Sequence, residues 1–251
     1  MEVHHHSSPA PGGTHTPRRK WRHYFWEFLM LFLAVFCGFL AEYQLEHKIE
    51  RDREKIYMQN LLEDLKTDTT IYSDFAKNNA VFYNLVDTLI TLIKSPERKK
   101  HINKLAYTAR LLTTKWRQLR PTERTYEDMK SSGHLRLIRK RKVADGVSYY
   151  YNSIKILDTY NEVGFLWASD YVKAMAKIFD GEVQLNIFKE KKEQATDAAT
   201  LLTEDRVVLN QLITSAGYLY GAVNLNENIG KERSITAQNL IELIQKEYRL
   251  K

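Results

Sequence analysis

Cysteine, proline and glycine are scarce in this chain of 251 residues, which has one cysteine, five prolines and ten glycines. The single Cys37 excludes an intrachain disulfide, so cysteine usage does not indicate the redox compartment. Neither proline nor glycine occurs between Tyr43 and Pro96. Because these two residue types interrupt helices, their absence predicts one long helix across that stretch.

The short motifs of common catalytic and cofactor sites are also missing. The sequence contains no phosphate-binding glycine loop, no HExxH, no CxxC and no GxSxG. The histidines outside the amino-terminal tail are scattered, at His23, His47, His101 and His134. One predicted helix carries three carboxylates, Glu63, Asp64 and Asp68. No sequence rule places a catalytic base beside them. We therefore expect a protein that is not an enzyme and needs no cofactor; a metal-dependent enzyme is the less favoured alternative.

One apolar segment organises the rest of the chain. No residue from Phe28 to Ala41 is charged, and residues 24–41 would form about 27 Å of helix, close to the roughly 30 Å of a hydrocarbon core. Rings suited to the headgroup region flank the segment: Trp21, Tyr24, Trp26 and Tyr43. A buried helix or a signal-peptide core has a similar length, but the flanks favour a retained membrane anchor, and no small-residue cleavage site follows.

Glu27 lies at the amino-terminal edge of this span. The favoured interpretation is an interfacial acid near Arg22 and His23, and the alternative is an intramembrane partner or proton site. A tight basic cluster precedes the span, whereas the basic residues after it are more distant and mixed with acids. The positive-inside rule therefore predicts a cytoplasmic amino terminus and a carboxy-terminal body outside the cytoplasmic membrane, in the periplasm of a diderm bacterium.

Three parts are predicted along the chain: a tail at residues 1–17, an anchor at 18–43 and a helical body with its stalk at 44–251. The tail consists largely of His, Ser, Pro, Gly and Thr, so it has little to bury and is expected to be disordered. Its histidines are not expected to form a specific metal site, because nothing fixes their geometry.

The fold class is predicted to be all-α, with the transmembrane helix continuing into a stalk and an antiparallel bundle of about four long helices. An interrupted heptad pattern follows the stalk, at Tyr72, Phe75, Asn79, Phe82, Val86, Leu89 and Ile93. It favours an intramolecular core, with a homodimeric coiled coil as the alternative. Further helices are expected from Ser95 to Pro121, along one face from Val143 through Phe165 to Phe179, and from Thr203 onward.

Charge is unevenly distributed in the sequence. Residues 94–142 carry 16 lysines and arginines against 4 acids, a surplus of +12 in a chain whose net charge is +7. The basic run Arg139, Lys140, Arg141 and Lys142 is a candidate face for anionic lipid headgroups or an acidic partner, and an ordinary solvated helix end is the equal alternative. Nucleic acid is not expected, because the anchor and the lack of a recognition motif argue against it.

Several stretches together resemble a family of uncharacterised single-pass membrane proteins, a domain of unknown function in Bacteroidetes-type bacteria. They are WEFLMLFLAVFCGFLAEYQLEHKIERDREK, LLEDLKTD, TYEDMKSSGHLRLI and YYYNS. The resemblance extends from Lys20 to Tyr160 and implies that Glu27 and the Ser131-Ser132-Gly133 turn are family features. It supplies no catalytic residues.

The leading hypothesis is a non-enzymatic, membrane-anchored interaction or sensory module whose partners are the lipid bilayer and a protein partner or a second copy of the chain. The alternative is a scaffold whose basic run docks on anionic membrane or an acidic partner.

Overall fold

The computed structural model describes residues 18–190 and 200–250, with side chains from residue 21 onward. The tail predicted to be disordered lies outside these residues. By its internal contacts the chain divides into two compact units, unit 1 at Met1–Arg53 and unit 2 at Glu54–Lys251.

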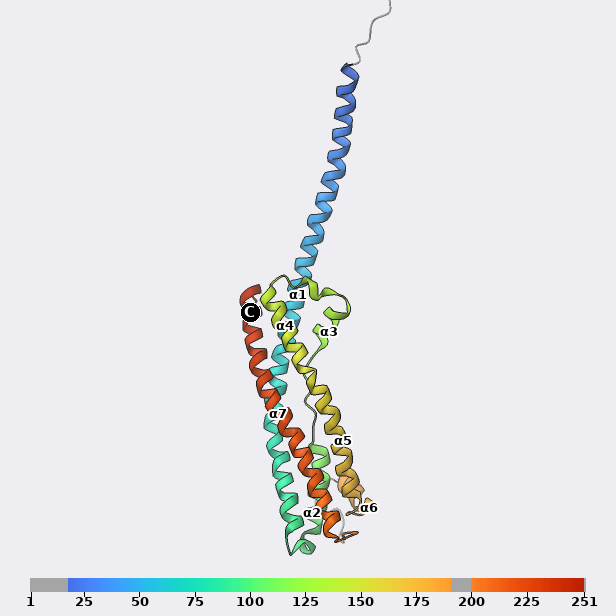
Figure 1. The fold of residues 1–251 in the computed structure, drawn as a ribbon, viewed down its shortest axis with the longest axis vertical. Coiled ribbons are helices and arrows are strands. Elements are labelled where there is room, and N and C mark those ends of the chain that lie inside the picture. The colour runs from blue at the N-terminus through green and yellow to red at the C-terminus, as the bar shows by residue number, and fades with distance from the viewer. Residues whose placement is uncertain (1–17, 191–199, 251) are drawn as a thin grey trace, which may run out of the picture. The chain divides into compact units, whose positions relative to one another are not determined.

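Helices dominate the described chain. They are α1 (Arg18–Lys94), α2 (Ile102–Lys115), α3 (Arg124–Ser131), α4 (Arg141–Ile154), α5 (Ile156–Ala176), α6 (Gly181–Glu190) and α7 (Arg206–Tyr248) (Figure 1). Two 3₁₀ turns add Arg98–His101 and His134–Leu137. Residues 18–190 and 200–250 contain no β-strand beyond one isolated bridge between Phe179 and Leu201. The predicted all-α class and the uninterrupted first helix are confirmed.

Unit 1 contributes the first part of α1, in which the stretch from Phe28 to Ala41 is apolar on all sides of the helix. No residue from Trp21 to Arg53 is buried. Phe28, Phe32 and Phe36 stack along one side of the helix, with successive ring centroids 6.2 and 5.8 Å apart. Within α1, an 18-residue window is long and apolar enough to cross a membrane, and none of it is buried in the protein.

Unit 2 is a bundle in which α7 runs beside α1, with α3 and α4 near one end and α2 and α6 near the other (Figure 1). Its core has two clusters of buried apolar side chains. The first joins residues 58–75 of α1 to α3, α4 and the second half of α7. The second joins residues 82–93 of α1 to α2, α5, α6 and the first half of α7. All seven positions of the predicted seam are buried, and the chain's own helices cover them.

The helix predicted to continue to Phe179 is instead divided into α4 and α5 at Lys155. Its buried face also differs from the predicted one, because Phe165 is 62% exposed while Gly164 is buried. A Cβ atom at Gly164 would lie 3.3 Å from the Trp116 ring. The Trp116 indole therefore occupies the space beside α5 at this point. The prediction that Phe165 is buried was wrong, because it was based only on the residue's apolar character and spacing.

The second predicted helix begins later and ends earlier than Ser95 and Pro121. A 3₁₀ turn precedes α2, and the backbone becomes extended at Trp116. Leu119 is nevertheless buried. The Asn161 side chain donates a hydrogen bond of 2.9 Å to the Leu119 carbonyl. The amide thus satisfies a backbone acceptor that a backbone N–H would satisfy within a helix.

Candidate functional site

The residues predicted to anchor the chain all lie on α1 in unit 1. Trp21, Tyr24, Trp26 and Tyr43 are exposed. The Glu27 side chain is exposed as well, and its Oε1 lies 3.1 Å from His23 Nε2, one turn earlier. These side chains present an aromatic and polar rim at the two ends of the apolar segment, as an interfacial position would require.

The predicted basic run lies at the start of α4, in unit 2, and its four side chains are exposed. Three of them have carboxylate neighbours. The Arg139 guanidinium lies 3.8 Å from Glu54, Lys140 lies 3.7 Å from Glu247, and Arg141 lies 3.9 Å from Asp145. Much of the run's positive charge is therefore offset within the protein.

Glu54 is the centre of a polar junction between three helices. It is buried on α1, and its Oε1 accepts hydrogen bonds from the Arg139 backbone N–H at 2.8 Å and from the Tyr248 hydroxyl. Burial, together with the hydrogen bond to Glu54, raises the pKa of Tyr248 above its usual range. This one carboxylate thus ties α1 to the start of α4 and the end of α7.

Two more acids, Asp64 and Asp68, are buried further along α1, about one helical turn apart. Asp64 accepts from Arg124 Nη2 at 2.7 Å and from the Thr125 N–H at 3.0 Å. It thereby satisfies a backbone donor in the first turn of α3 and places a negative charge at the positive end of that helix.

Asp68 is fully buried, with no exposed surface. Its two oxygens accept hydrogen bonds from the Thr122 N–H at 2.6 Å and from the Tyr150 hydroxyl at 2.7 Å. Burial raises the pKa of Asp68 to about 6, outweighing the lowering effect of the bonds from Tyr150 and Thr122. Asp68 therefore joins α1, the segment before α3, and α4.

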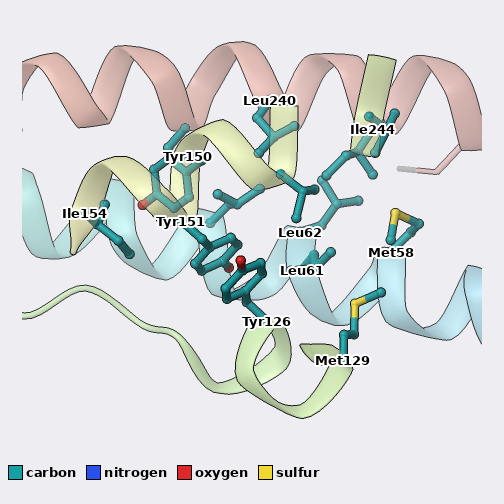
Figure 2. Close-up of a cluster of buried hydrophobic side chains, with 14 of the residues drawn as sticks. Met58, Leu61, Leu62, Tyr126, Met129, Tyr150, Tyr151, Ile154, Leu240 and Ile244 are labelled. Atoms are coloured by element: carbon teal, nitrogen blue, oxygen red, sulfur yellow. The ribbon is translucent and has the colours of Figure 1, made fainter. Parts of the chain in front are cut away.

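A chain of tyrosines surrounds this acid. Because Tyr150 donates to Asp68, its oxygen accepts from the Tyr72 hydroxyl 2.9 Å away. Burial raises the pKa of both phenols well above their usual range. Figure 2 shows Tyr126 and Tyr151 facing each other beside the apolar core, and their rings are stacked 4.3 Å apart. The Tyr151 hydroxyl is buried without a hydrogen-bond partner among the described residues.

The sequence singled out Asp64 and Asp68 but supplied no partner for either. Their partners lie 54 to 82 residues away in the chain and include two backbone N–H groups. The YYYNS stretch contributes Tyr150 and Tyr151 to this cluster, because α4 turns both rings toward the core. Within residues 18–190 and 200–250, no three His, Cys, Asp or Glu side chains gather closely enough to hold a metal ion.

A surface feature that the sequence did not indicate lies between α5 and α7. This groove, the α5/α7 groove, has a volume of about 650 Å³. Most of its lining comes from two helices: Trp167, Asp170 and Lys173 from α5, and Gln211, Thr214, Ser215 and Tyr218 from α7. Lys177, the first residue after α5, completes the lining. The residues from each helix lie at the edge of that helix's buried face. Helical periodicity predicts which face is buried, but it does not predict which edges of two helices lie together.

The fold and these sites define an all-α protein with one helix that could cross a membrane. No protein-family model, curated protein or solved structure matches the chain.

Proposed function

We propose that this protein is a single-pass protein of the cytoplasmic membrane whose helical body, unit 2, is an interaction or sensory module rather than an enzyme. The observation that carries the proposal is the apolar part of α1, none of which is buried in the protein. Each large apolar side chain left in water costs about 1.5–3 kcal/mol relative to a buried one. A bilayer offers such a segment an apolar environment, and the α-helix satisfies its backbone hydrogen bonds internally.

The flanking residues support this placement and give it a direction. Trp21, Trp26 and Tyr43 would lie at the two headgroup regions. The basic cluster before the span is closer to it than the mixed charges after it, so the amino terminus is placed in the cytoplasm and unit 2 outside. In a diderm bacterium, unit 2 would lie in the periplasm.

Unit 2 is suited to binding a partner on a preformed surface. Glu54, Asp64 and Asp68 attach α1 to irregular segments and helix ends, so the surface of the bundle is held by buried hydrogen bonds. Rigid surfaces lose less conformational entropy on binding. The partner class we favour is a protein, a second copy of the chain, or a soluble ligand outside the cytoplasm.

Docking of the basic run on anionic membrane receives less support from the contacts. Arg139 and Lys140 lie beside Glu54 and Glu247, so part of their charge is used within the bundle. We assign these two residues to holding the start of α4. Lys142 is exposed and remains the member of the run most open to an external anion.

A topology experiment tests the proposal. A reporter active only outside the cytoplasm is fused after Lys251. As the control, a reporter active only in the cytoplasm is fused at the same position in a second strain. We expect activity from the external reporter and retention of the protein in membranes washed with alkaline carbonate. Activity from the cytoplasmic reporter alone, or release by carbonate, would contradict the proposal.

A further inference from the structure

The α5/α7 groove is an open surface groove with the volume of a small-molecule site. α5 and α7 run antiparallel, with Trp167 beside Tyr218 at one end and Lys177 bonded to Gln211 at the other. At 1.5 Å per residue, the distance between these ends is about 10 Å along α7 and about 15 Å along α5. The groove volume of about 650 Å³ falls within the range of roughly 300–1,000 Å³ that ligand sites occupy.

One end of the groove is an aromatic wall. The ring centroids of Trp167 and Tyr218 lie 5.4 Å apart, with their planes inclined by 34°. Trp167 packs against the second core cluster, which fixes its position, while Tyr218 is 56% exposed. Both rings offer a flat apolar face and a polar tip. Such a wall suits a ring that has an apolar face and hydroxyl groups at its edge.

The middle of the groove is lined by short polar side chains. Thr214 and Ser215 contribute two hydroxyls, and Gln211 contributes an amide. Hydroxyls and amides both donate and accept hydrogen bonds. A ligand with many hydroxyl groups could use them along its length, whereas a purely aromatic ligand would leave them unpaired.

Two lysines give the groove a positive edge. Lys173 Nζ lies 3.0 Å from Asp170, and Lys177 Nζ donates to Gln211 at 3.1 Å. Each ammonium has three N–H donors, so each retains two beyond these contacts. Exposed pairs of this kind are weak and rearrange easily. With two lysines and one acid, the lining carries a net charge of +1 and favours an anion.

Together these features point to one ligand class. We propose that the α5/α7 groove binds an acidic saccharide, with a sugar ring against Trp167 and Tyr218 and a carboxylate at Lys173 and Lys177. The proposal rests on the proposed function, because it names the ligand of the module outside the membrane. A neutral sugar would leave Lys177 with only the neutral Gln211 amide as a partner. An aromatic acid would leave Thr214 and Ser215 without hydroxyl partners.

The test uses the full chain in lipid nanodiscs and digalacturonic acid as the probe, with binding measured by calorimetry. Tyr218→Ala and the double variant Lys173→Gln/Lys177→Gln are each expected to weaken binding at least tenfold. Tyr218→Phe, which keeps the ring, should lose less than Tyr218→Ala. The matched controls are Tyr149→Ala, an aromatic that is 62% exposed on α4, and Lys104→Gln/Lys246→Gln, which removes the same charge at two exposed positions outside the groove. Both controls should bind within twofold of the parent.

Specificity is tested with a neutral galactose disaccharide and with benzoate, each expected to bind at least tenfold more weakly than digalacturonic acid. Absence of digalacturonate binding, equal losses in the control variants, or equally tight binding of benzoate or the neutral sugar would each overturn the proposal. These results are separable from the topology result. An external reporter with no saccharide binding overturns the ligand alone, whereas a cytoplasmic reporter overturns the proposed function.

Discussion

Two segments of α1 use apolar side chains in opposite ways. From Phe28 to Ala41 apolar residues follow one another on all sides of the helix, and none is buried. From Tyr72 to Ile93 apolar residues recur every three or four positions, and that single stripe is buried against other helices of unit 2. A stripe can be covered by neighbouring helices, whereas a helix that is apolar all round needs an apolar surrounding. The pattern, rather than the amount of apolar surface, therefore separates the two segments.

The largest effect is expected from placing charge within the first segment. Arginine near the centre of a membrane helix costs about 3 kcal/mol for each residue, so Leu31→Arg/Val35→Arg should cost about 6 kcal/mol. We expect the double variant to leave the membrane fraction after carbonate extraction. Val207→Arg/Ile235→Arg places the same charges at exposed apolar positions of unit 2 and should leave the membrane fraction unchanged. Equal retention of both variants would remove the distinction between the segments.

A substitution that creates a cavity in the second segment should lower the stability of unit 2 without changing membrane anchoring. Phe82 is 1% exposed, and Phe82→Ala should lower the free energy of unfolding by about 3–5 kcal/mol. The measurement is urea unfolding of the full chain in detergent micelles, followed by circular dichroism. Val81→Ala removes an adjacent, exposed side chain and should cost less than about 0.5 kcal/mol. Similar losses from both variants would show that the stripe is not buried as described.

The pH dependence of unfolding should reveal the buried Asp68. Its pKa is about 6 in the folded protein against 3.8 for a free aspartate. Between these values the folded state holds more protons on Asp68 than the unfolded state. The contribution of Asp68 to stability is therefore greatest below pH 4 and is lost as the pH rises through 6. The pKa difference corresponds to about 3 kcal/mol. We expect Asp68→Asn to remove this decrease, because an amide carries no charge to desolvate.

The control for this measurement is Asp74→Asn, an exposed acid on the same helix. It should keep the decrease between pH 4 and 6. Urea unfolding at several pH values provides the comparison. A decrease of equal size in Asp68→Asn would mean that another group titrates in this range.

Two glycines of α7 should respond with opposite signs. A Cβ atom at Gly230 would lie 3.1 Å from Leu119 Cδ2 and 3.4 Å from Tyr72 Cδ1. A Cβ atom at Gly217 would have no neighbouring atom within 4 Å. Gly230→Ala should therefore destabilise unit 2 by about 1–3 kcal/mol. Gly217→Ala should stabilise it by up to about 1 kcal/mol, since alanine is the better helix former. Thermal unfolding compares the two, and a stabilising Gly230→Ala would contradict the close packing.

The sequence predicted the parts of the fold that depend on local periodicity. The long first helix and the buried stripe from Tyr72 to Ile93 could both be expected from spacing and residue type. Phe165 could not be placed correctly, because its exposure depends on the Trp116 ring that fills the space at Gly164. Contacts between distant segments override the local pattern there.

The candidate sites were harder to predict for the same reason. Asp68 receives its hydrogen bonds from Tyr150 and from a backbone N–H at Thr122, and no spacing rule connects these positions. The basic run was visible in the sequence, but its carboxylate neighbours Glu54 and Glu247 lie in other helices. Side-chain type can be taken from a sequence, whereas its partners depend on the tertiary fold.

The single cysteine provides the most direct test of the membrane placement, because Cys37 lies within the apolar segment. A charged, water-soluble maleimide is added to membranes opened on both sides, before and after solubilisation in SDS. We predict that Cys37 is protected from the maleimide in the membranes and labelled in SDS. The control variant Cys37→Ser/Val207→Cys, with its cysteine at an exposed position, should be labelled in both conditions. Equal labelling of Cys37 before and after solubilisation would contradict the placement of this segment in the bilayer.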